Sequence, residues 1–152
     1  MDLDETDRSL LALLQRDAQA TSEALGTALN LSPSQAGRRR QRLERAGVIR
    51  GYAARLDPDR LGLAVQAFIH VHMAHHGSEA AGAFVRMLRA QPEIAGAWTL
   101  TGDADYLLRV HCADLAALNR LVQGVLLPHP SVARLHSQIV MEECKPDGPL
   151  PV

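Results

Sequence analysis

Residues 21–46 read TSEALGTALNLSPSQAGRRRQRLERA, and this stretch decides the fold of the first third of the chain. Ser32 can cap a helix, Pro33 suits the first helical position, and Gln35 can return a capping-box hydrogen bond. The sequence therefore predicts a helix that begins at Pro33 and stops at Gly47, where a glycine can end it.

Two further helices are predicted before this one. Apolar residues at helical spacing predict the first over about residues 4–18, with Asp4 as its N-cap. The second begins at Thr21 or Ser22 and ends at Asn30, a residue type that tolerates the left-handed conformation. Two short helices joined by a tight turn, the second rich in arginine, are typical of a helix-turn-helix.

Charge is distributed unevenly over these helices. Residues 1–32 hold two arginines against six acids, a net charge of −4. Residues 33–55 hold seven arginines against Glu44 alone, a net charge of +6, although the whole chain carries −1. A cationic stretch of this kind favours the phosphates of double-stranded DNA, and a solvated helix face is the alternative interpretation.

The residues that would touch DNA follow from how a helix-turn-helix docks. The first turns of its second helix reach base edges, while residues further along contact phosphates. This geometry nominates Ser34, Gln35 and Arg38 for bases, and Arg39 and Arg42 for phosphates. The full candidate set for DNA binding is Ser32, Ser34, Gln35, Arg38, Arg39 and Arg42.

The second half of the chain has a different pattern. Val48–Tyr52 and Ala53–Leu56 predict a short extended pair, and strict alternation from Ala64 predicts a strand of about ten residues. A helix opening at Ser78, strands over about 94–101 and 105–112, a helix capped by Asp114 and a strand over about 132–143 follow. The order β-α-β-β-α-β is the ferredoxin-like unit, an antiparallel sheet with both helices on one face.

Several classes of protein are disfavoured. No apolar run approaches the roughly 20 residues of a membrane span, and the acidic N-terminus is unlike a secretory signal, so we expect a cytoplasmic protein. Cys112 and Cys144 lack disulfide-framework or metal-ligand spacing. Because no nucleophile–base pair or glycine-rich phosphate loop is evident, we expect no enzyme, no catalytic residue and no cofactor.

Two polar clusters leave alternatives open. Asp103 and Asp105 separate two predicted strands, and by their chemistry they fit an ordinary hairpin or, less well, an acid/base pair or a hard-metal site. His70 and His72 share a strand face, with further histidines on the same predicted sheet. An oligomer interface and a zinc site are both conceivable there, and we assign no metal.

Five motifs in order resemble the leucine-responsive regulatory protein (Lrp/AsnC) family of transcription factors over nearly the whole chain. They are Leu3-Asp4-x-x-Asp7 with Leu10 and Leu11, Leu31-Ser32-Pro33-Ser34, Arg42-Leu43-Glu44-x-x-Gly47-Val48-Ile49-x-Gly51-Tyr52, Leu61-Gly62, and Thr101-Gly102-Asp103-x-Asp105-Tyr106-Leu107-Leu108-Arg109-Val110.

The resemblance implies an α+β fold, with an N-terminal winged helix-turn-helix domain joined to a ferredoxin-like βαββαβ domain. The expected boundaries are 1–50 for the DNA-binding domain, 51–63 for a linker or short extended segment, and 64–152 for effector binding and oligomerisation. It also implies an amino-acid effector and a homo-oligomer of dimers, commonly four dimers in an octameric ring. The effector-binding residues implied are Thr101, Gly102, Asp103, Asp105 and Tyr106.

Two positions depart from the family pattern. Arg40 lies on the apolar side of the third helix, where relatives usually carry an aliphatic residue, so its side chain must snorkel or pair. Ala104 is smaller than the residue in many relatives. An architectural DNA-binding protein with little effector response, and a ferredoxin-like small-molecule enzyme, are the alternative functions. Footprint length and a turnover assay would distinguish them.

Overall fold

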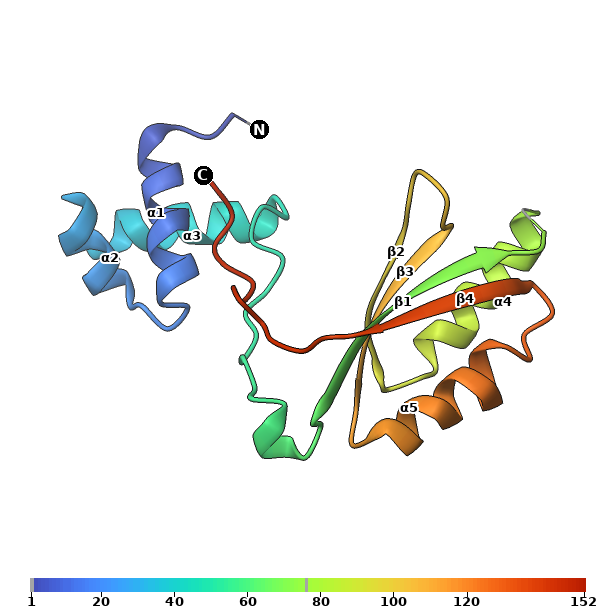
Figure 1. Cartoon of the computed structure of the whole chain (residues 1–152). Helices are drawn as coiled ribbons and strands as arrows, with labels where there is room; N and C mark the ends of the chain where they lie inside the picture. The colour runs from blue at the N-terminus through green and yellow to red at the C-terminus, as the bar shows by residue number, and fades with distance from the viewer. Residues whose placement is uncertain (1, 76) are drawn as a thin grey trace. The chain divides into compact units, whose positions relative to one another are not determined.

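The computed structural model describes residues 2–75 and 77–152, which fall into two compact units (Figure 1). The helical unit contains the chain up to Arg55 together with Cys144–Val152, and the sheet unit contains Leu56–Glu143. The sequence-based boundaries, by contrast, assign the last nine residues to the second domain and residues 56–63 to a linker.

The C-terminal segment groups with the helical unit because it bonds to residues of that unit. The Gln15 side chain accepts from the Leu150 amide at 2.6 Å and donates to the Leu150 carbonyl at 3.0 Å. Arg55 donates to the Asp147 carbonyl at 2.7 Å. On the C-terminal segment the bonded groups are backbone groups, which almost every residue type has. The sequence of that segment therefore gives no sign of these contacts.

Three helices build the helical unit: α1 (Glu5–Arg16), α2 (Ser22–Leu29) and α3 (Pro33–Arg45). Each begins at a side-chain cap. Asp4 and Thr21 accept backbone amides ahead of α1 and α2, and Ser32 forms a reciprocal capping box with Gln35. The three predicted helices are confirmed, and their observed ends differ from the predicted ones by up to two residues. Their core is leucine-rich: Leu10, Leu11, Leu14, Leu25, Ala36 and Leu43.

The turn between α2 and α3 depends on a close backbone approach. Asn30 takes the left-handed conformation at φ 55°, and the Leu31 amide donates to the Gly26 carbonyl at 2.8 Å. A Cβ atom on Gly26 would lie 2.7 Å from the Leu31 carbonyl oxygen, which is closer than real Cβ contacts come. Glycine at this position therefore allows the tight helix-turn-helix connection.

The short extended pair predicted after α3 is wrong. Residues 46–58 contain no strand, and the only regular element between α3 and the sheet is a 3-10 turn at Asp59–Leu61. Nothing between Tyr52 and Ala53 reverses the chain direction, so the two segments cannot pair with each other. Tyr52 packs against α3 instead, as described below.

The sheet unit has the predicted β-α-β-β-α-β order. Its elements are β1 (Val65–Met73), α4 (Ser78–Arg89), β2 (Ile94–Thr99), β3 (Tyr106–Cys112), α5 (Leu115–Leu121) with a π-helical turn (Val122–Leu126), and β4 (Val132–Ile139). The strands are ordered β2-β3-β1-β4, and every neighbouring pair is antiparallel. β2 and β4 end before their predicted limits of 101 and 143.

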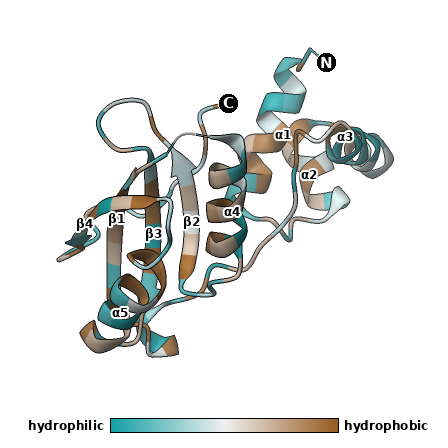
Figure 2. Cartoon of the chain, turned by 90° about the vertical axis from the view of Figure 1, so that its right-hand side faces the viewer, coloured by the Kyte–Doolittle hydropathy of each residue, from teal (hydrophilic) through white to brown (hydrophobic). Residues whose placement is uncertain are grey.

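Both helices cover one face of this sheet (Figures 1 and 2). Alternate residues of β1 and β3 point into the core, where they meet Phe84 and Leu88 of α4 and Leu118 and Leu121 of α5. The intervening residues lie on the helix-free face. The register sets Arg134 opposite His72, His136 opposite His70 and Gln138 opposite Phe68 on that face.

Candidate DNA-binding and ligand-binding sites

The N-terminal turn of α3 presents exposed polar residues. Ser32 and Gln35 bond each other's backbone amides at 3.2 and 2.9 Å, and the Ser32 and Ser34 hydroxyls lie 3.1 Å apart. The two capping side chains are thus held in fixed positions. Gln35 uses its carbonyl oxygen in the cap, which leaves its amide nitrogen free to donate to an acceptor outside the protein.

Arg38 follows one turn later and is exposed. Across residues 2–75 and 77–152 it has no ion-pair or hydrogen-bonding partner. A long cationic side chain in this situation keeps all its donors available for phosphate or base oxygens.

Arg39 and Arg42 bind acids of the helical unit, although both side chains stay partly exposed. Asp7 of α1 is almost fully buried, at 1% exposure, and both guanidinium groups converge on its carboxylate. Arg42 binds both Asp7 oxygens at 2.5 and 2.6 Å, and Arg39 binds Asp7 at 2.7 Å and Asp4 at 2.6 Å. The Arg39 hydrogen bond holds the pKa of the Asp4 carboxyl below its ordinary value, and the Asp7 amide adds to this.

These contacts make Asp7 the link between α1 and α3. We call Asp4, Asp7, Arg39 and Arg42 the Asp7 cluster. Sequence reasoning placed Asp7 in a motif and three residues after the Asp4 cap, where it completes a capping box, but missed its role as the partner of two arginines. A signal was nevertheless present, because Asp7 occupies a helical position of the buried stripe formed by Leu3, Leu10, Leu11 and Leu14, where an acid requires a partner.

Arg40 pairs, as its place on the apolar side requires. It donates to the Ala20 carbonyl and to Glu44, both at 3.1 Å, and its guanidinium lies 4.7 Å from the centre of the Tyr52 ring. The Tyr52 hydroxyl donates to Glu44 at 2.8 Å. This bond, followed by that from Arg40, lowers the pKa of Glu44. The segment after α3 is thereby attached to the helix.

The predicted effector turn has divided roles in the structure. Thr101, Gly102 and Asp103 are exposed, and Gly102 has φ +113° with open space around its Cβ position. Asp105 instead accepts the Met73 amide at 2.7 Å, which fixes the turn against β1. Tyr106 is buried on the helix-covered face, with its ring centre 5.0 Å from that of Phe84.

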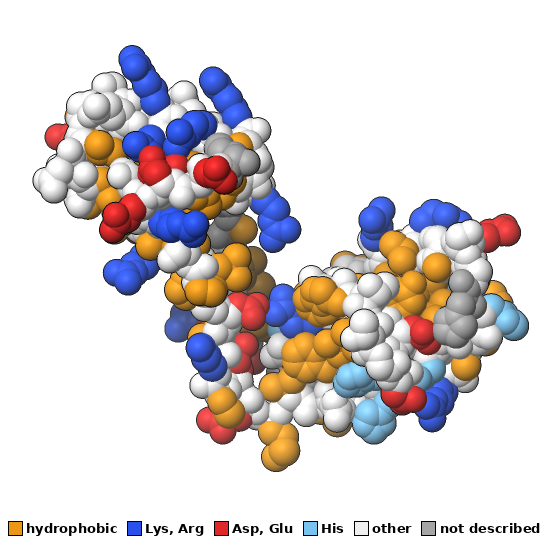
Figure 3. Space-filling model, turned by 90° about the horizontal axis from the view of Figure 1, so that it is seen from above, with side chains coloured by type: hydrophobic (Ala, Val, Ile, Leu, Met, Phe, Trp, Pro, Cys, Tyr) orange, Lys and Arg blue, Asp and Glu red, His pale blue; other side chains and the backbone are white. Residues whose placement is uncertain are grey.

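A basin of about 660 Å³ lies beside this turn, on the helix-free face. It is lined by His70, His72, Leu100, Thr101, Asp103, Ala104, Arg134, Leu135, His136 and Gln138. Asp103 lies 3.4 Å from the Arg134 guanidinium and 3.8 Å from the His72 ring. Figure 3 shows histidine side chains gathered on one side of the sheet unit beside acidic and basic ones. The structure therefore joins the turn to the histidine face in one basin.

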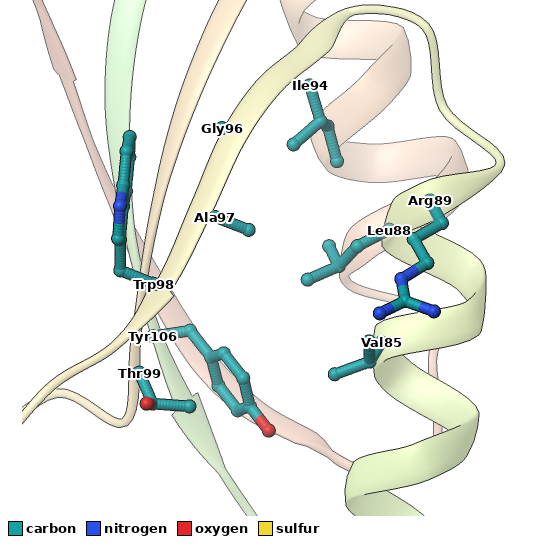
Figure 4. Close-up of a pocket in the computed structure, with 9 residues that line it drawn as sticks. All are labelled: Val85, Leu88, Arg89, Ile94, Gly96, Ala97, Trp98, Thr99 and Tyr106. Atoms are coloured by element: carbon teal, nitrogen blue, oxygen red, sulfur yellow. The ribbon is translucent and has the colours of Figure 1, made fainter. Parts of the chain in front are cut away.

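A second cavity, of about 590 Å³, lies on the other face between α4 and β2 (Figure 4). Val85, Leu88 and Arg89 face Ile94 and Ala97 across it. Its lining is mostly apolar, and Arg89 is its only charged residue. Trp98 points to the opposite side of β2 (Figure 4), where the Arg109 guanidinium lies 5.8 Å from its ring centre.

The described part of the chain offers little other chemistry. Within residues 2–75 and 77–152, no three His, Cys, Asp or Glu side chains gather closely enough to hold a metal ion. Burial raises the pKa of the Cys112 thiol, which keeps it protonated and unreactive. No helix among the described residues combines the length and apolar character needed to cross a membrane.

Comparison with known proteins covers both units. Residues 3–44 match the AsnC-type helix-turn-helix domain, and residues 66–150 match the Lrp/AsnC ligand-binding domain. The DNA-binding transcriptional activator DecR of Escherichia coli K12 is 37% identical over 150 residues, which is 99% of each chain. The E. coli K12 leucine-responsive regulatory protein is 33% identical, over 95% of this chain and 88% of its own.

Solved structures agree along the whole chain. A Neisseria meningitidis transcriptional regulator in complex with L-Met has a TM-score of 0.94 and 37% identity, covering 99% of this chain and 97% of its own. An AsnC family regulator from Agrobacterium tumefaciens has a TM-score of 0.91 and 32% identity, covering 98% and 97%. With a helix-turn-helix in one unit and a ligand-binding βαββαβ sheet in the other, the chain belongs to the Lrp/AsnC family of DNA-binding transcriptional regulators.

Proposed function

We propose that this regulator binds double-stranded DNA through α3 and changes that binding when a small amino acid occupies the basin of the sheet unit. The observation that carries the first part is the exposed Arg38, which lies one turn after the Ser32–Gln35 cap and pairs with none of the residues that the structure describes. The second part is supported by the ligand-binding domain family and by the relative whose structure contains L-Met.

The candidate DNA contacts divide into two groups. Ser34, Gln35 and Arg38 have atoms free to meet base edges, and Ser32 lies beside them at the helix N-terminus, which favours a phosphate. Arg39 and Arg42 contact phosphate through the guanidinium nitrogens that the Asp7 cluster leaves unused. Their main contribution is to hold α3 in place, so the loss of Arg38 should affect DNA contact most directly.

Discrimination between DNA sequences tests this division. Replacing Arg38→Ala should reduce the preference for the specific site over other DNA by about 1–3 kcal/mol, because a base contact is lost. Arg120→Ala, an exposed arginine of the sheet unit, is the matched control and should leave this preference unchanged. If both variants behave like the wild-type protein, α3 is not the DNA-binding element.

Effector control is tested at Asp103. A thermal-shift screen of the twenty amino acids identifies the responsive one, because ligand at 100 times its Kd stabilises by about 2.7 kcal/mol. Asp103→Ala should then weaken the binding of that amino acid, measured by calorimetry, and abolish its effect on DNA affinity. In the wild-type protein we expect this effect to be about 5- to 150-fold. Effector-free DNA affinity should stay unchanged; loss of DNA binding with intact ligand affinity would contradict the proposal.

Of the remaining effector-turn residues, Thr101 and Gly102 are proposed to approach the ligand. Gly102 has no side chain, so its backbone groups can come close to a bound molecule. Asp105 and Tyr106 act by positioning, since one holds the turn against β1 and the other packs in the core. The matched test is Thr101→Ala, which should reduce the affinity for the amino acid less than Asp103→Ala does.

The assembly is proposed to be a homodimer through the helix-free face, with four dimers in an octamer, acting on DNA in the cytoplasm. Trp98 on this face is 46% exposed beside Leu107, so apolar surface is available for a partner. Trp98→Asp should shift light-scattering mass toward the monomer. Leu115→Asp, an exposed apolar residue of α5, should not.

A further inference from the structure

We propose that the cavity between α4 and β2 binds a small aliphatic monocarboxylate, a molecule with one carboxylate on a short alkyl chain. This site is separate from the basin and requires no amino group on its ligand, so the inference goes beyond the proposed function. The cavity lies on the helix-covered face of the sheet (Figure 4), which the proposed homodimer leaves open.

The walls of this cavity are apolar on both sides. Aliphatic side chains of α4 and of β2 face one another across it (Figure 4): Val85, Leu88, Ile94 and Ala97. The buried ring of Tyr106 adds to the lining. The volume of about 590 Å³ falls within the roughly 300–1,000 Å³ of pockets that hold small molecules. An alkyl chain that enters would leave water for these walls, and this transfer favours binding.

A single cation lies beside these apolar walls. Arg89 is the last residue of α4, and its side chain turns back along the helix, so that the guanidinium faces the space between Val85 and Tyr106 (Figure 4). Among residues 2–75 and 77–152 it has no hydrogen-bond or ion-pair partner, and none of the described lining residues is acidic. A guanidinium offers parallel N–H donors that match the two oxygens of a carboxylate. The cavity therefore combines one anion site with an aliphatic surface.

The same lining disfavours a ligand that carries an amino group. Besides Arg89, its side chains with polar atoms are Thr99, Tyr106 and the outward-pointing Trp98, and none of them supplies a negative charge. Arg89 would repel an ammonium group, and the apolar walls would remove water from it. The cavity should therefore reject free amino acids, which carry an ammonium group next to their carboxylate.

Calorimetry on the full chain with hexanoate, hexan-1-ol and hexylammonium separates the effect of the head group from that of the alkyl chain. Hexanoate should bind about tenfold or more tightly than hexan-1-ol, because only its carboxylate gains charge-assisted hydrogen bonds from Arg89. Hexylammonium should bind most weakly of the three. Butanoate should bind about tenfold more weakly than hexanoate, since two fewer methylene groups leave water.

Two variants locate the binding site. In Arg89→Gln the affinity for hexanoate should fall about tenfold, to the level of hexan-1-ol, while the affinity for hexan-1-ol stays the same. In Ala97→Leu the larger side chain should fill the cavity, and both probes should lose binding. The control is Arg86→Gln, which removes an exposed arginine of the same helix outside the lining and should bind both probes as the wild-type protein does.

Three results would overturn the proposal: no binding of hexanoate, equal binding of hexanoate and hexylammonium, or hexanoate binding that Arg89→Gln leaves intact. Light scattering on Ala97→Leu tests another occupant, because a loss of assembly mass with no hexanoate binding to the wild-type protein would assign the cavity to a contact between copies. If circular dichroism shows that Ala97→Leu does not fold, Arg89→Gln and its control still decide. None of these measurements involves DNA or an amino acid, so failure here leaves the proposed function standing.

Discussion

In the helical unit, charged side chains of α1 and α3 bind one another. In the sheet unit, by contrast, charged side chains line an open basin. The Asp7 cluster joins α1 to α3, whereas the Arg40–Glu44–Tyr52 contacts attach the segment that follows α3 to that helix. The core of the sheet unit is made of apolar side chains, apart from the Tyr106 ring and the Cys112 thiol. The polar groups that line its basin lie on the helix-free face and at the turn.

This difference changes what a count of arginines means. Three of the five arginines in α3 bind acids of their own unit, and they stabilise the fold that presents the DNA-contacting residues. The local charge of +6 therefore overstates the number of phosphate contacts. In the basin, by contrast, Asp103 and Arg134 lie exposed at the surface, and the sheet unit is held together by its apolar core and by the hydrogen bonds between its strands.

The largest effect is expected from Asp7→Asn, which preserves shape and removes the charge. Breaking a buried ion pair costs about 3–5 kcal/mol, and partial exposure of the two arginines reduces this to about 2–3 kcal/mol. In urea unfolding of the full chain, the midpoint of the transition followed by helical circular dichroism should fall. The midpoint followed by fluorescence of Trp98, the only tryptophan, should stay the same, because Trp98 reports on the sheet unit.

The control for that measurement is Glu5→Gln, an exposed acid in the same first turn. It should change stability by well under 1 kcal/mol. If Asp7→Asn lowers the unfolding midpoint seen by tryptophan fluorescence as much as the midpoint seen by circular dichroism, the two units unfold together. The contrast between them would then not extend to their stability.

A smaller effect is expected from Gly26→Ala. The added methyl group would press on the Leu31 carbonyl, and overpacking of this kind costs about 1–3 kcal/mol. DNA affinity should fall as well, because this turn orients α3. Gly124→Ala in the sheet unit has open space around its Cβ position and should be close to neutral. Equal losses in both variants would show that space at Gly26 is not what matters.

The smallest effect is expected from Tyr52→Phe, and it depends on pH. The folded state lowers the pKa of Glu44, so the stabilisation is present above the ordinary value of 4.5 and is lost as pH falls through the lowered value. The wild-type protein should exceed the variant in thermal stability at pH 7, and the difference should shrink as the pH falls below 4.5. A constant difference across this range would assign the effect to packing of the ring.

Much of the fold was predictable because local signals carried it. Asp4, Thr21 and Ser32 mark helix starts, and period-two alternation from Ala64 marks β1, so the helix-turn-helix and the βαββαβ order are confirmed. The paired extended segment after α3 was predicted from apolar residues alone. It failed because the chain there has no turn, and Tyr52 finds a partner on the helix instead.

The sites were predictable only in part. The cap at Ser32 and the turn at Gly102 were found, because each depends on neighbouring residues. The approach of Arg134 to Asp103 depends on the β1–β4 register and on the path of the turn, which no short window of sequence contains. The partners of Arg39 and Arg42 likewise follow from how α1 crosses α3.

The bonds between Gln15 and Leu150 give the chain an unusual connectivity. Both ends of the sequence belong to the helical unit, so the sheet unit is an insertion within it, entered near residue 55 and left near residue 144. Two covalent segments therefore join the two units, and the second continues directly from β4, which carries Arg134. Because that segment ends in the hydrogen bonds with Gln15, the last residues of the chain complete the surface of α1 and are a structural part of the DNA-binding unit.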